Sequence, residues 1–280
     1  MAISEKGTAL VTGASSGIGA IYADRLARRG YNLILVARNR GRLDGLAKRL
    51  SDETGRVVEI VTADLTDKAD LARIEALLRT DASITALVNN AGVGATAPLL
   101  GADVEKMDDL IALNVRALTR LTYAAVPGFV TRGQGTIINI ASSVAITPES
   151  LNGVYGGSKA FVLAFSFSLQ HELADKGIRI QTVLPGATAT DLWALAGLPY
   201  QNLPKEIVMS PGDMVDAALV GLDQRELVTI PSLQDTDEWT QWEAGRRALA
   251  QHFGHSLPAA RYRTGAASQG STQGEIHGQA

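Results

Sequence analysis

Short apolar runs alternate with longer stretches of mixed polarity along most of the chain. The runs are rich in valine, isoleucine and leucine at consecutive positions, as in strands that are buried on both faces. Six such runs precede residue 190, at residues 8–11, 32–37, 57–62, 86–89, 136–140 and 178–183. We therefore expect six buried strands in this part of the chain.

The stretches between the runs place apolar residues at helical spacing. Helices are predicted over residues 18–29, 42–53, 68–79, 104–130, 154–176, 211–222 and 237–252. Pro127 is expected to kink or break the fourth of them. Residues 227–230 predict a seventh strand. Strands that alternate with helices form parallel sheets, so the pattern predicts a single-domain α/β fold: a doubly wound (Rossmann-type) parallel seven-stranded sheet with helices on both faces.

The pattern changes at residues 190–210, which are apolar and aromatic and are interrupted by glycine and proline. We predict that this lid segment is mobile and has an apolar inner face, and a short helix that covers core is the alternative. Its large apolar side chains include Trp193, Leu195, Leu198 and Tyr200. From residue 264 the chain is mostly Gly, Ser, Gln and Ala, which predicts a disordered tail over residues 264–280. We therefore expect one domain over residues 1–263.

Composition narrows the possible functions. The chain has 280 residues, of which 46% are hydrophobic and 20% charged, and its net charge is −3. These values indicate a globular protein and give no reason to expect a nucleic-acid or membrane partner. The chain has no cysteine, and its four histidines lack a metal-ligand spacing, so neither a disulfide nor a metal site is expected. The first residues show no signal-peptide pattern, so the expected location is cytoplasmic.

A glycine-rich turn connects the first predicted strand to the first helix. It reads Gly13-Ala14-Ser15-Ser16-Gly17-Ile18-Gly19. Glycine permits a sharp turn and a close approach of the backbone to a pyrophosphate, and the helix N-terminus attracts its negative charge. The segment predicts a dinucleotide site.

The end of the second predicted strand indicates which dinucleotide binds. An acidic residue at this place commonly binds the adenosine ribose, but here Ala37 is followed by Arg38. An arginine suits a 2′-phosphate, which favours NADP(H) over NAD, although a solvated helix start is the alternative. Asp64 follows the third strand and is placed to contact the adenine edge, or else to cap a turn.

Tyr155 and Lys159 are four residues apart in a predicted helix and so share one face. A nearby ammonium favours phenolate, so we expect Lys159 to lower the pKa of Tyr155 from its usual value of ~10. Such a tyrosine exchanges a proton with a carbonyl or alcohol oxygen. Ser142 follows the fifth strand, at the sheet edge where such folds bind ligands.

The combined pattern resembles the short-chain dehydrogenase/reductase family over about residues 5–230. The resemblance rests on the glycine-rich turn, the segment Asn89-Asn90-Ala91-Gly92, Asn114, Ser142, Tyr155 with Lys159, and Pro185-Gly186 with Thr190, which come in the family's order. It implies a catalytic set of Ser142, Tyr155, Lys159 and Asn114. Ser142 would stabilise the carbonyl oxygen, Tyr155 would exchange the proton, Lys159 would bind the nicotinamide ribose, and Asn114 would hold a water.

The resemblance also implies a set of residues that bind NADP(H). Arg38 and Ser15 would meet the 2′-phosphate, and Asp64 and Leu65 would flank the adenine. The full set is Gly13, Ser15, Ser16, Gly17, Ile18, Gly19, Arg38, Asp64, Leu65, Asn90, Ala91, Gly92, Tyr155, Lys159, Pro185, Gly186, Thr188 and Thr190. Some NADP-using members carry a basic residue within the glycine motif, where this chain has Ser15-Ser16.

These features predict an NADPH-dependent oxidoreductase that reduces a ketone, an aldehyde or a 3-oxoacyl group. An alcohol dehydrogenase working in the oxidative direction and a non-catalytic NADP-binding redox sensor are the alternatives. The apolar lid segment favours a partly apolar small-molecule substrate. The resemblance further implies a homodimer or homotetramer, formed through the two long predicted helices.

Overall fold

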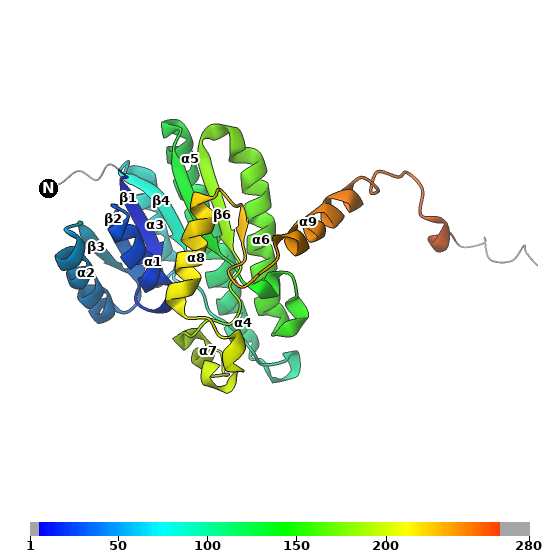
Figure 1. Ribbon diagram of the computed structural model, residues 1–280, viewed down its shortest axis with the longest axis horizontal. Helices are drawn as coiled ribbons and strands as arrows, with labels where there is room; N and C mark the ends of the chain where they lie inside the picture. Colours follow the sequence, from blue (N-terminus) through cyan, green and yellow to red (C-terminus); the bar gives the residue numbers. More distant parts are fainter. Residues whose placement is uncertain (1–5, 264–280) are drawn as a thin grey trace, which may run out of the picture. The chain divides into compact units, whose positions relative to one another are not determined.

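The computed structural model describes residues 6–263, and Figure 1 shows how its elements are arranged. The described strands are all parallel and form one seven-stranded sheet in the order β3-β2-β1-β4-β5-β6-β7. They are β1 (Thr8–Thr12), β2 (Asn32–Ala37), β3 (Val58–Thr62), β4 (Ile84–Asn89), β5 (Gly135–Ile140), β6 (Ile178–Val183) and β7 (Val228–Thr229). The chain moves outward from β1 to β3, returns to β4 beside β1, and then moves outward in the other direction. This reversal places a switch point between β1 and β4, where such sheets bind ligands.

Helices cover both faces of the sheet (Figure 1). The described helices are α1 (Gly17–Arg28), α2 (Arg40–Thr54), α3 (Lys68–Thr80), α4 (Val104–Ile111), α5 (Leu118–Arg132), α6 (Gly153–Leu173), α7 (Asp191–Leu195), α8 (Pro211–Asp223) and α9 (Thr236–Ala250). One core lies between the sheet and α1, α2 and α8, and the other between the sheet and α3, α5 and α6. Successive β1 residues enter opposite cores, because side chains of a strand alternate between faces. The predicted class of fold is confirmed.

Asparagine side chains set the start of two helices that carry candidate site residues. Asn39 Oδ1 accepts a hydrogen bond from the Arg42 N–H at 3.0 Å, so α2 begins two residues before the predicted position. Asn152 Oδ1 accepts from the Val154 and Tyr155 N–H groups, at 2.9 and 3.3 Å. Tyr155 therefore lies in the first turn of α6.

The long helix predicted over residues 104–130 is divided into α4, a π-helical turn at Ala112–Ala117, and α5. Of the kink or break expected at Pro127, the break is wrong, because Pro127 lies inside α5, which continues to Arg132. The irregularity occurs instead around Asn114, within the π-helical turn. Such turns are frequent at functional sites.

The chain forms two compact units, Met1–Ser232 and Leu233–Ala280. The first contains the whole sheet, and the expected single domain over residues 1–263 stays a prediction. The second contains α9, which has no buried residue. The predicted tail, residues 264–280, lies outside the described residues. Within the described range, no helix is long and apolar enough to cross a membrane.

A row of buried polar side chains connects the middle of the sheet to α5 and α6. Asn89 on β4 and Asn139 on β5 are register partners, and Asn89 Nδ2 donates to Asn139 Oδ1 at 2.9 Å and to Thr122 Oγ1 at 3.1 Å. Asn139 Nδ2 donates to Ser166 Oγ at 3.0 Å. The row thus joins two adjacent strands and the two helices that cover them.

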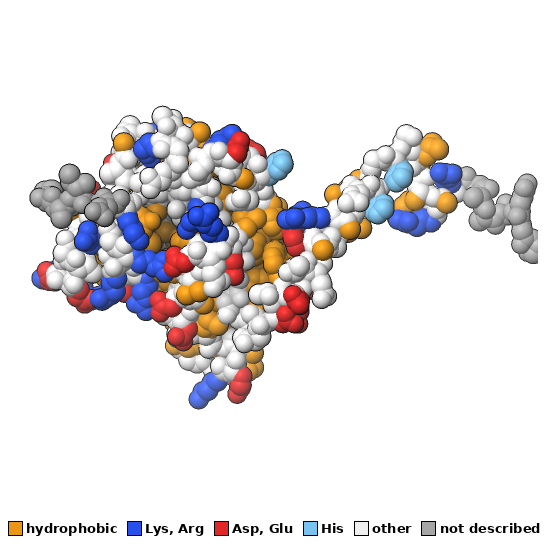
Figure 2. Space-filling view, turned by 45° about the horizontal axis from the view of Figure 1, so that its top comes forward, with side chains coloured by type: hydrophobic (Ala, Val, Ile, Leu, Met, Phe, Trp, Pro, Cys, Tyr) orange, Lys and Arg blue, Asp and Glu red, His pale blue; other side chains and the backbone are white. Residues whose placement is uncertain are grey.

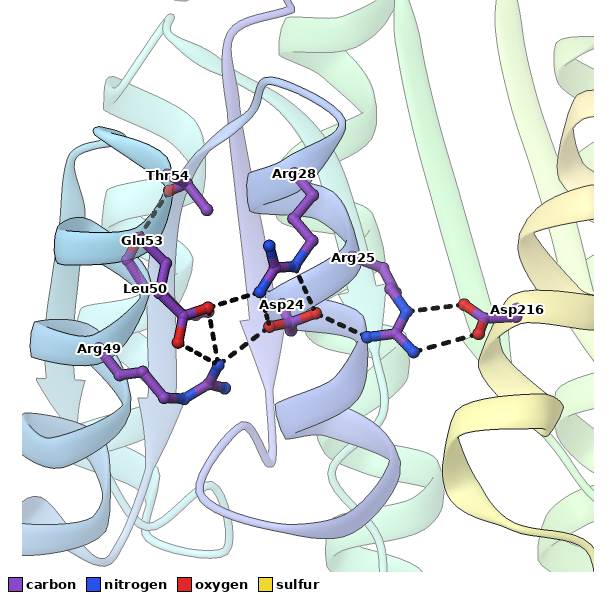
Figure 3. Close-up of polar contacts among 8 residues, drawn as sticks. All are labelled: Asp24, Arg25, Arg28, Arg49, Leu50, Glu53, Thr54 and Asp216. Atoms are coloured by element: carbon purple, nitrogen blue, oxygen red, sulfur yellow. Dashed lines mark hydrogen bonds and ion pairs between the residues drawn. The ribbon is translucent and has the colours of Figure 1, made fainter.

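A cluster of charges joins α1, α2 and α8 around Asp24 (Figure 3). The Asp24 carboxylate is buried and accepts hydrogen bonds from Arg25 at 2.7 Å, Arg28 at 3.1 Å and Arg49 at 3.1 Å. Burial raises the pKa of Asp24, but the hydrogen bonds from the three arginines outweigh it and leave the pKa below its ordinary value. Arg25 also donates to Asp216 on α8 at 2.7 Å. Basic side chains lie beside acidic ones on the face of the first unit shown in Figure 2.

Replacing Asp24 by asparagine is expected to lower the free energy of unfolding by about 1–2 kcal/mol. The side chains of Arg25, Arg28 and Arg49 are 31%, 50% and 47% exposed, so they can turn to water and the cost stays below that of a fully buried pair. Urea denaturation checks the value, with the exposed Asp216→Asn as the matched control. If Asp24→Asn lowers the free energy of unfolding no more than Asp216→Asn does, the burial of Asp24 adds nothing to the strength of its hydrogen bonds.

Candidate functional site

Two adjoining cavities lie at the carboxyl ends of the central strands. The larger, of about 400 Å³, is bordered by the glycine-rich turn and by residues that follow β2, β3 and β4. The smaller, of about 120 Å³, is bordered by Ser142, Tyr155 and Lys159. The two cavities share Ile18, Asn90, Gly92, Thr190 and Leu192. They therefore form one continuous cleft at the switch point.

The glycine-rich turn has the close packing that its sequence predicts. Gly13 and Gly17 have φ angles of +64° and +52°, a conformation that favours glycine. A Cβ placed on Gly19 would lie 2.4 Å from the Gly13 carbonyl oxygen and 2.5 Å from Asn90 Nδ2. Gly19 thus brings α1 against the turn and does not line either cavity, whereas Gly13 and Gly17 line the larger one.

Thr12 and Asn90 hold the ends of β1 and β4 together. Thr12 Oγ1 accepts from the Asn90 and Ala91 N–H groups, both at 3.0 Å, and Asn90 Nδ2 donates to the Thr12 carbonyl at 2.9 Å. The role of Thr12 was not predicted, although a threonine at the end of a buried strand could have indicated it.

Arg38 and Asp64 face each other in the larger cavity. Arg38 Nη1 lies 3.9 Å from Asp64 Oδ2, and the Arg38 side chain is largely exposed. Asp64 Oδ1 accepts hydrogen bonds from the Thr66 N–H and hydroxyl, at 2.9 and 2.7 Å. Burial raises the pKa of Asp64, but these hydrogen bonds and the charge of Arg38 outweigh it, so the pKa is lowered. Asp64 is therefore both a turn residue and a cavity residue, as the two alternatives allowed.

Ser142, Tyr155 and Lys159 come together in the smaller cavity. The Ser142 side chain lies close enough to the Tyr155 phenol to act on its pKa as a hydrogen-bond partner, and Ser142 Oγ donates to the Pro185 carbonyl at 3.4 Å. Lys159 Nζ lies 5.9 Å from the centre of the Tyr155 ring and donates to the Ile140 carbonyl at 2.9 Å. Both Tyr155 and Lys159 are almost fully buried, at 7% and 6% exposure.

Burial dominates the protonation of this pair. It raises the pKa of Tyr155 above its ordinary value of 10.0, and the hydrogen bond with Ser142 offsets only part of the effect. The expectation that Lys159 lowers the pKa of Tyr155 is therefore wrong for this structure. Burial also lowers the pKa of Lys159 from 10.5 to about 8. The folded environment keeps Tyr155 protonated and places Lys159 near the point where it loses its charge.

Asn114 lies behind the cleft and lines neither cavity. Its Nδ2 donates to the Val93 carbonyl at 2.9 Å and to Ser158 Oγ at 3.1 Å, and its Oδ1 accepts from the Val93 N–H at 3.0 Å. A Cβ placed on Gly92 would lie 3.1 Å from Asn114 Oδ1 and 3.6 Å from Lys159 Nζ. Asn114 is thus next to Lys159, with Gly92 between them.

The lid segment borders both cavities through its first turns. Leu192 lines both, Leu195 lines the larger, and Trp193 and Ala196 line the smaller, whereas Leu198 and Tyr200 line neither. Residues 191–195 form the short helix α7, which has no buried residue and borders the cavities instead of covering core, and the mobility of the segment stays a prediction. Pro185, Gly186, Thr188 and Thr190 line the smaller cavity, and their role in binding NADP(H) stays a prediction.

Several cleft residues were not predicted as site residues. Arg42 and Asp191 line the larger cavity and form an ion pair at 3.7 Å. Thr96 lines the smaller cavity, and its hydroxyl donates to the Ala196 carbonyl at 2.6 Å. These pairs join residues far apart in the sequence, and no local pattern indicates them.

Comparisons with known proteins agree with this geometry. A family model described as short chain dehydrogenase matches residues 7–198. A short-chain dehydrogenase from Sphingobium yanoikuyae, solved with NADPH, is 49% identical with a TM-score of 0.89, and the match covers 92% of this chain and 100% of that one. A bulky-bulky ketone specific alcohol dehydrogenase from Comamonas testosteroni is 44% identical with a TM-score of 0.85, over 91% and 98% of the two chains.

A curated relative is more distant. The very-long-chain 3-oxoacyl-CoA reductase of Anas platyrhynchos is 36% identical over 189 residues, and the match covers 66% of this chain but only 60% of that protein. The resemblance inferred from the motifs is confirmed by the family model, which covers more than half of the chain. The chain belongs to the short chain dehydrogenase family.

Proposed function

We propose that the protein is an NADP(H)-dependent oxidoreductase that reduces a ketone, aldehyde or 3-oxoacyl group to an alcohol. The observation that carries the proposal is the placement of Ser142, Tyr155 and Lys159 in one cavity, continuous with a second cavity that contains the glycine-rich turn and Arg38. The smaller cavity has a proton donor, and the larger one has the features of a dinucleotide site.

The residues present fit NADP(H). Gly13 and Gly17 leave backbone space beside the N-terminus of α1, which suits a pyrophosphate. Arg38 lies in the same cavity and supplies a cation for a 2′-phosphate. When bound, NADP(H) supplies the hydride. Two solved relatives whose descriptions name NADPH or NADP support this choice, the Sphingobium enzyme and an alcohol dehydrogenase from Thermococcus sibiricus.

The chain's own residues account for the proton in this proposal. Tyr155 stays protonated because its pKa is raised by burial, so its phenol is available as a proton donor. Ser142 lines the same cavity as Tyr155 and would donate to a carbonyl oxygen as negative charge develops there. Lys159 is held by the Ile140 carbonyl and would bind ribose hydroxyls.

The smaller cavity favours a partly apolar substrate. Its apolar lining includes Ala95, Val144, Leu151 and Trp193. The relatives include an alcohol dehydrogenase specific for bulky-bulky ketones and a very-long-chain 3-oxoacyl-CoA reductase, whose substrates have large apolar portions. We infer that a bulky ketone or a 3-oxoacyl thioester is the substrate class.

We also propose a homodimer or homotetramer, as the sequence analysis expected. Tyr123 on α5 stacks on Phe165 of α6, which stacks on Phe161. Tyr123 is 70% exposed and Phe161 37%, so the row presents aromatic surface to solvent. The cytoplasmic location also stays a proposal.

Arg38→Ala tests the cofactor assignment. The wild-type protein is expected to bind NADPH at least ~10-fold more tightly than NADH, about 1.4 kcal/mol, and the variant should lose most of this preference. Titration by cofactor fluorescence measures both affinities. The control is Arg40→Ala, because Arg40 lies two residues after Arg38, at the start of α2, but does not line the cavity. A wild-type preference for NADH would contradict the assignment.

The reaction itself is tested by a carbonyl panel with NADPH. The panel contains a bulky aryl ketone, a small methyl ketone, an aldehyde and a 3-oxoacyl thioester, each followed at 340 nm. Turnover of at least one bulky compound is expected. NADPH binding without turnover of any panel member would favour the redox-sensor alternative.

A further inference from the structure

The lid segment is connected to the cofactor side of the cleft by a single charged contact among the described residues. Arg42 Nη1, on the first turn of α2, lies 3.7 Å from Asp191 Oδ2, on the first residue of α7. Both residues line the larger cavity, with Arg38 and Asp64. The contact therefore crosses the mouth of the space where the proposed cofactor would place its 2′-phosphate.

The two ion pairs in this cavity differ in how firmly their carboxylates are held. Asp64 is fixed by two hydrogen bonds from Thr66, besides its contact with Arg38. The Asp191 carboxylate has only Arg42 as an ion-pair partner in the described part of the chain, and its side chain is 69% exposed. Asp191 is thus the carboxylate that can leave its arginine at little cost.

Charge balance makes a 2′-phosphate a competitor of Asp191. The cavity's four charged side chains are two arginines and two aspartates, so they sum to zero. A phosphate brings up to two negative charges and three acceptor oxygens into this neutral set, and a guanidinium binds it more strongly than it binds a single exposed carboxylate. Among residues 6–263 Arg42 has no other carboxylate partner, and its side chain is 55% exposed and can turn.

We propose that Arg42 binds the 2′-phosphate of the cofactor and releases Asp191, so that the phosphate frees the lid segment. The inference rests on the proposed function and adds two residues to it. Arg42 is a specificity residue for NADP(H), and Asp191 is its competitor on the lid segment. Directly after α7 the segment stays attached, because Thr96 donates to the Ala196 carbonyl at 2.6 Å. Release would therefore let the first turn of α7 move while its end remains held.

The consequence extends to the substrate side. Leu192 follows Asp191 directly and lines both cavities. A Cβ placed on Gly94 would lie 2.9 Å from Leu192 Cδ2, so Leu192 packs closely against the loop that follows β4. Movement of Asp191 would loosen this packing. The binding of NADP(H), and not of NAD(H), would thereby change the access to the smaller cavity.

The affinity test uses adenosine 2′,5′-bisphosphate and AMP, which differ only in the 2′-phosphate. Calorimetry at low ionic strength measures both affinities. Arg42→Gln is expected to weaken the binding of the bisphosphate about five- to tenfold and the binding of AMP less than twofold. Asp191→Asn should tighten the binding of the bisphosphate about two- to fivefold, the range expected for one exposed ion pair, and should leave the affinity for AMP unchanged. In the Arg42→Gln background the Asp191→Asn effect should vanish.

Two control variants exclude simpler causes. Arg40→Gln removes the same charge from the same helix turn outside the cavity, and should change the bisphosphate affinity less than twofold. Asp191→Glu keeps the negative charge at the start of α7 and should behave as the wild type. If Asp191→Glu tightens the binding of the bisphosphate as Asp191→Asn does, the proposal that the carboxylate competes with the phosphate for Arg42 is overturned.

Lid movement is read from Trp193, which lies on α7 and lines the smaller cavity. Replacing Trp239 and Trp242 by phenylalanine leaves Trp193 as the sole tryptophan of the three in the chain. We expect the bisphosphate, but not AMP, to shift its emission, and Asp191→Asn to show the shifted emission without ligand. Wild-type emission and affinity in Asp191→Asn overturn the inference while leaving the Arg38 assignment intact. Equal wild-type affinity for bisphosphate and AMP would overturn the proposed NADP(H) preference itself.

Discussion

Tyr155→Phe is expected to lower kcat for carbonyl reduction by about 10²–10⁴-fold, the usual contribution of a positioned proton donor. The change removes one oxygen, and the ring keeps its packing with Ala95, Leu110 and Val144. Cofactor affinity should therefore stay within about threefold of the wild type. Steady-state assays on the best substrate of the carbonyl panel, together with NADPH titration, separate the two effects.

Tyr22→Phe is the matched control for this experiment. Tyr22 is fully buried, and its hydroxyl has no hydrogen-bond partner in the described structure, so the variant also loses one buried phenolic oxygen. It should retain the wild-type kcat, because the Tyr22 side chain extends from α1 into the core and not into the cleft. A Tyr155→Phe variant as active as the Tyr22→Phe variant would remove Tyr155 from the proton-transfer step.

Lys159→Met is expected to remove the rise in stability that the wild-type protein gains at alkaline pH. The pKa of Lys159 is about 8 in the folded protein and about 10.5 when unfolded. Between these values the unfolded chain binds a proton that the folded chain does not, so the free energy of unfolding increases with pH. At about 1.4 kcal/mol per pH unit, the gain between pH 7 and 10 is roughly 2–3 kcal/mol.

Urea denaturation of the cofactor-free proteins at pH 7 and pH 10 measures this gain. The stability difference between wild type and variant is taken at each pH, so that constant contributions, such as the lost hydrogen bond to Ile140, cancel. The free energy of unfolding should rise with pH more in the wild type than in the variant. A difference that does not change with pH would mean that water reaches the Lys159 amine. If the gain is found, the protein retains at neutral pH a buried charge that destabilises its fold.

The fold and much of the cleft could be predicted because they depend on local sequence. Strands buried on both faces appear as continuous apolar runs, and the short turn from Gly13 to Gly19 contains the whole strand-to-helix connection. The four-residue spacing of Tyr155 and Lys159 placed them on one helix face. The π-helical turn at Asn114 could not be predicted, since apolar spacing does not distinguish it from an α-helix.

What could not be predicted depends on contacts between distant segments. The sequence shows that Lys159 is near Tyr155, but the burial that raises one pKa and lowers the other arises only when α6 packs against the sheet. Likewise Thr96 and Ala196, which are 100 residues apart, meet only in the folded cleft. The ion pair between Arg42 and Asp191 also joins segments that are far apart in the sequence.

The buried pair of Asn89 and Asn139 has a consequence for how the sheet assembles. The two amides meet only when β4 and β5 pair in the native register. A shift of one residue between the strands would place the two side chains on opposite faces of the sheet, so that each amide would lose the other as its partner in an apolar layer. Isoleucine or valine at these positions would tolerate such a shift more easily. The pair therefore acts as a check against misaligned strands during folding, a selectivity that apolar packing alone would not provide.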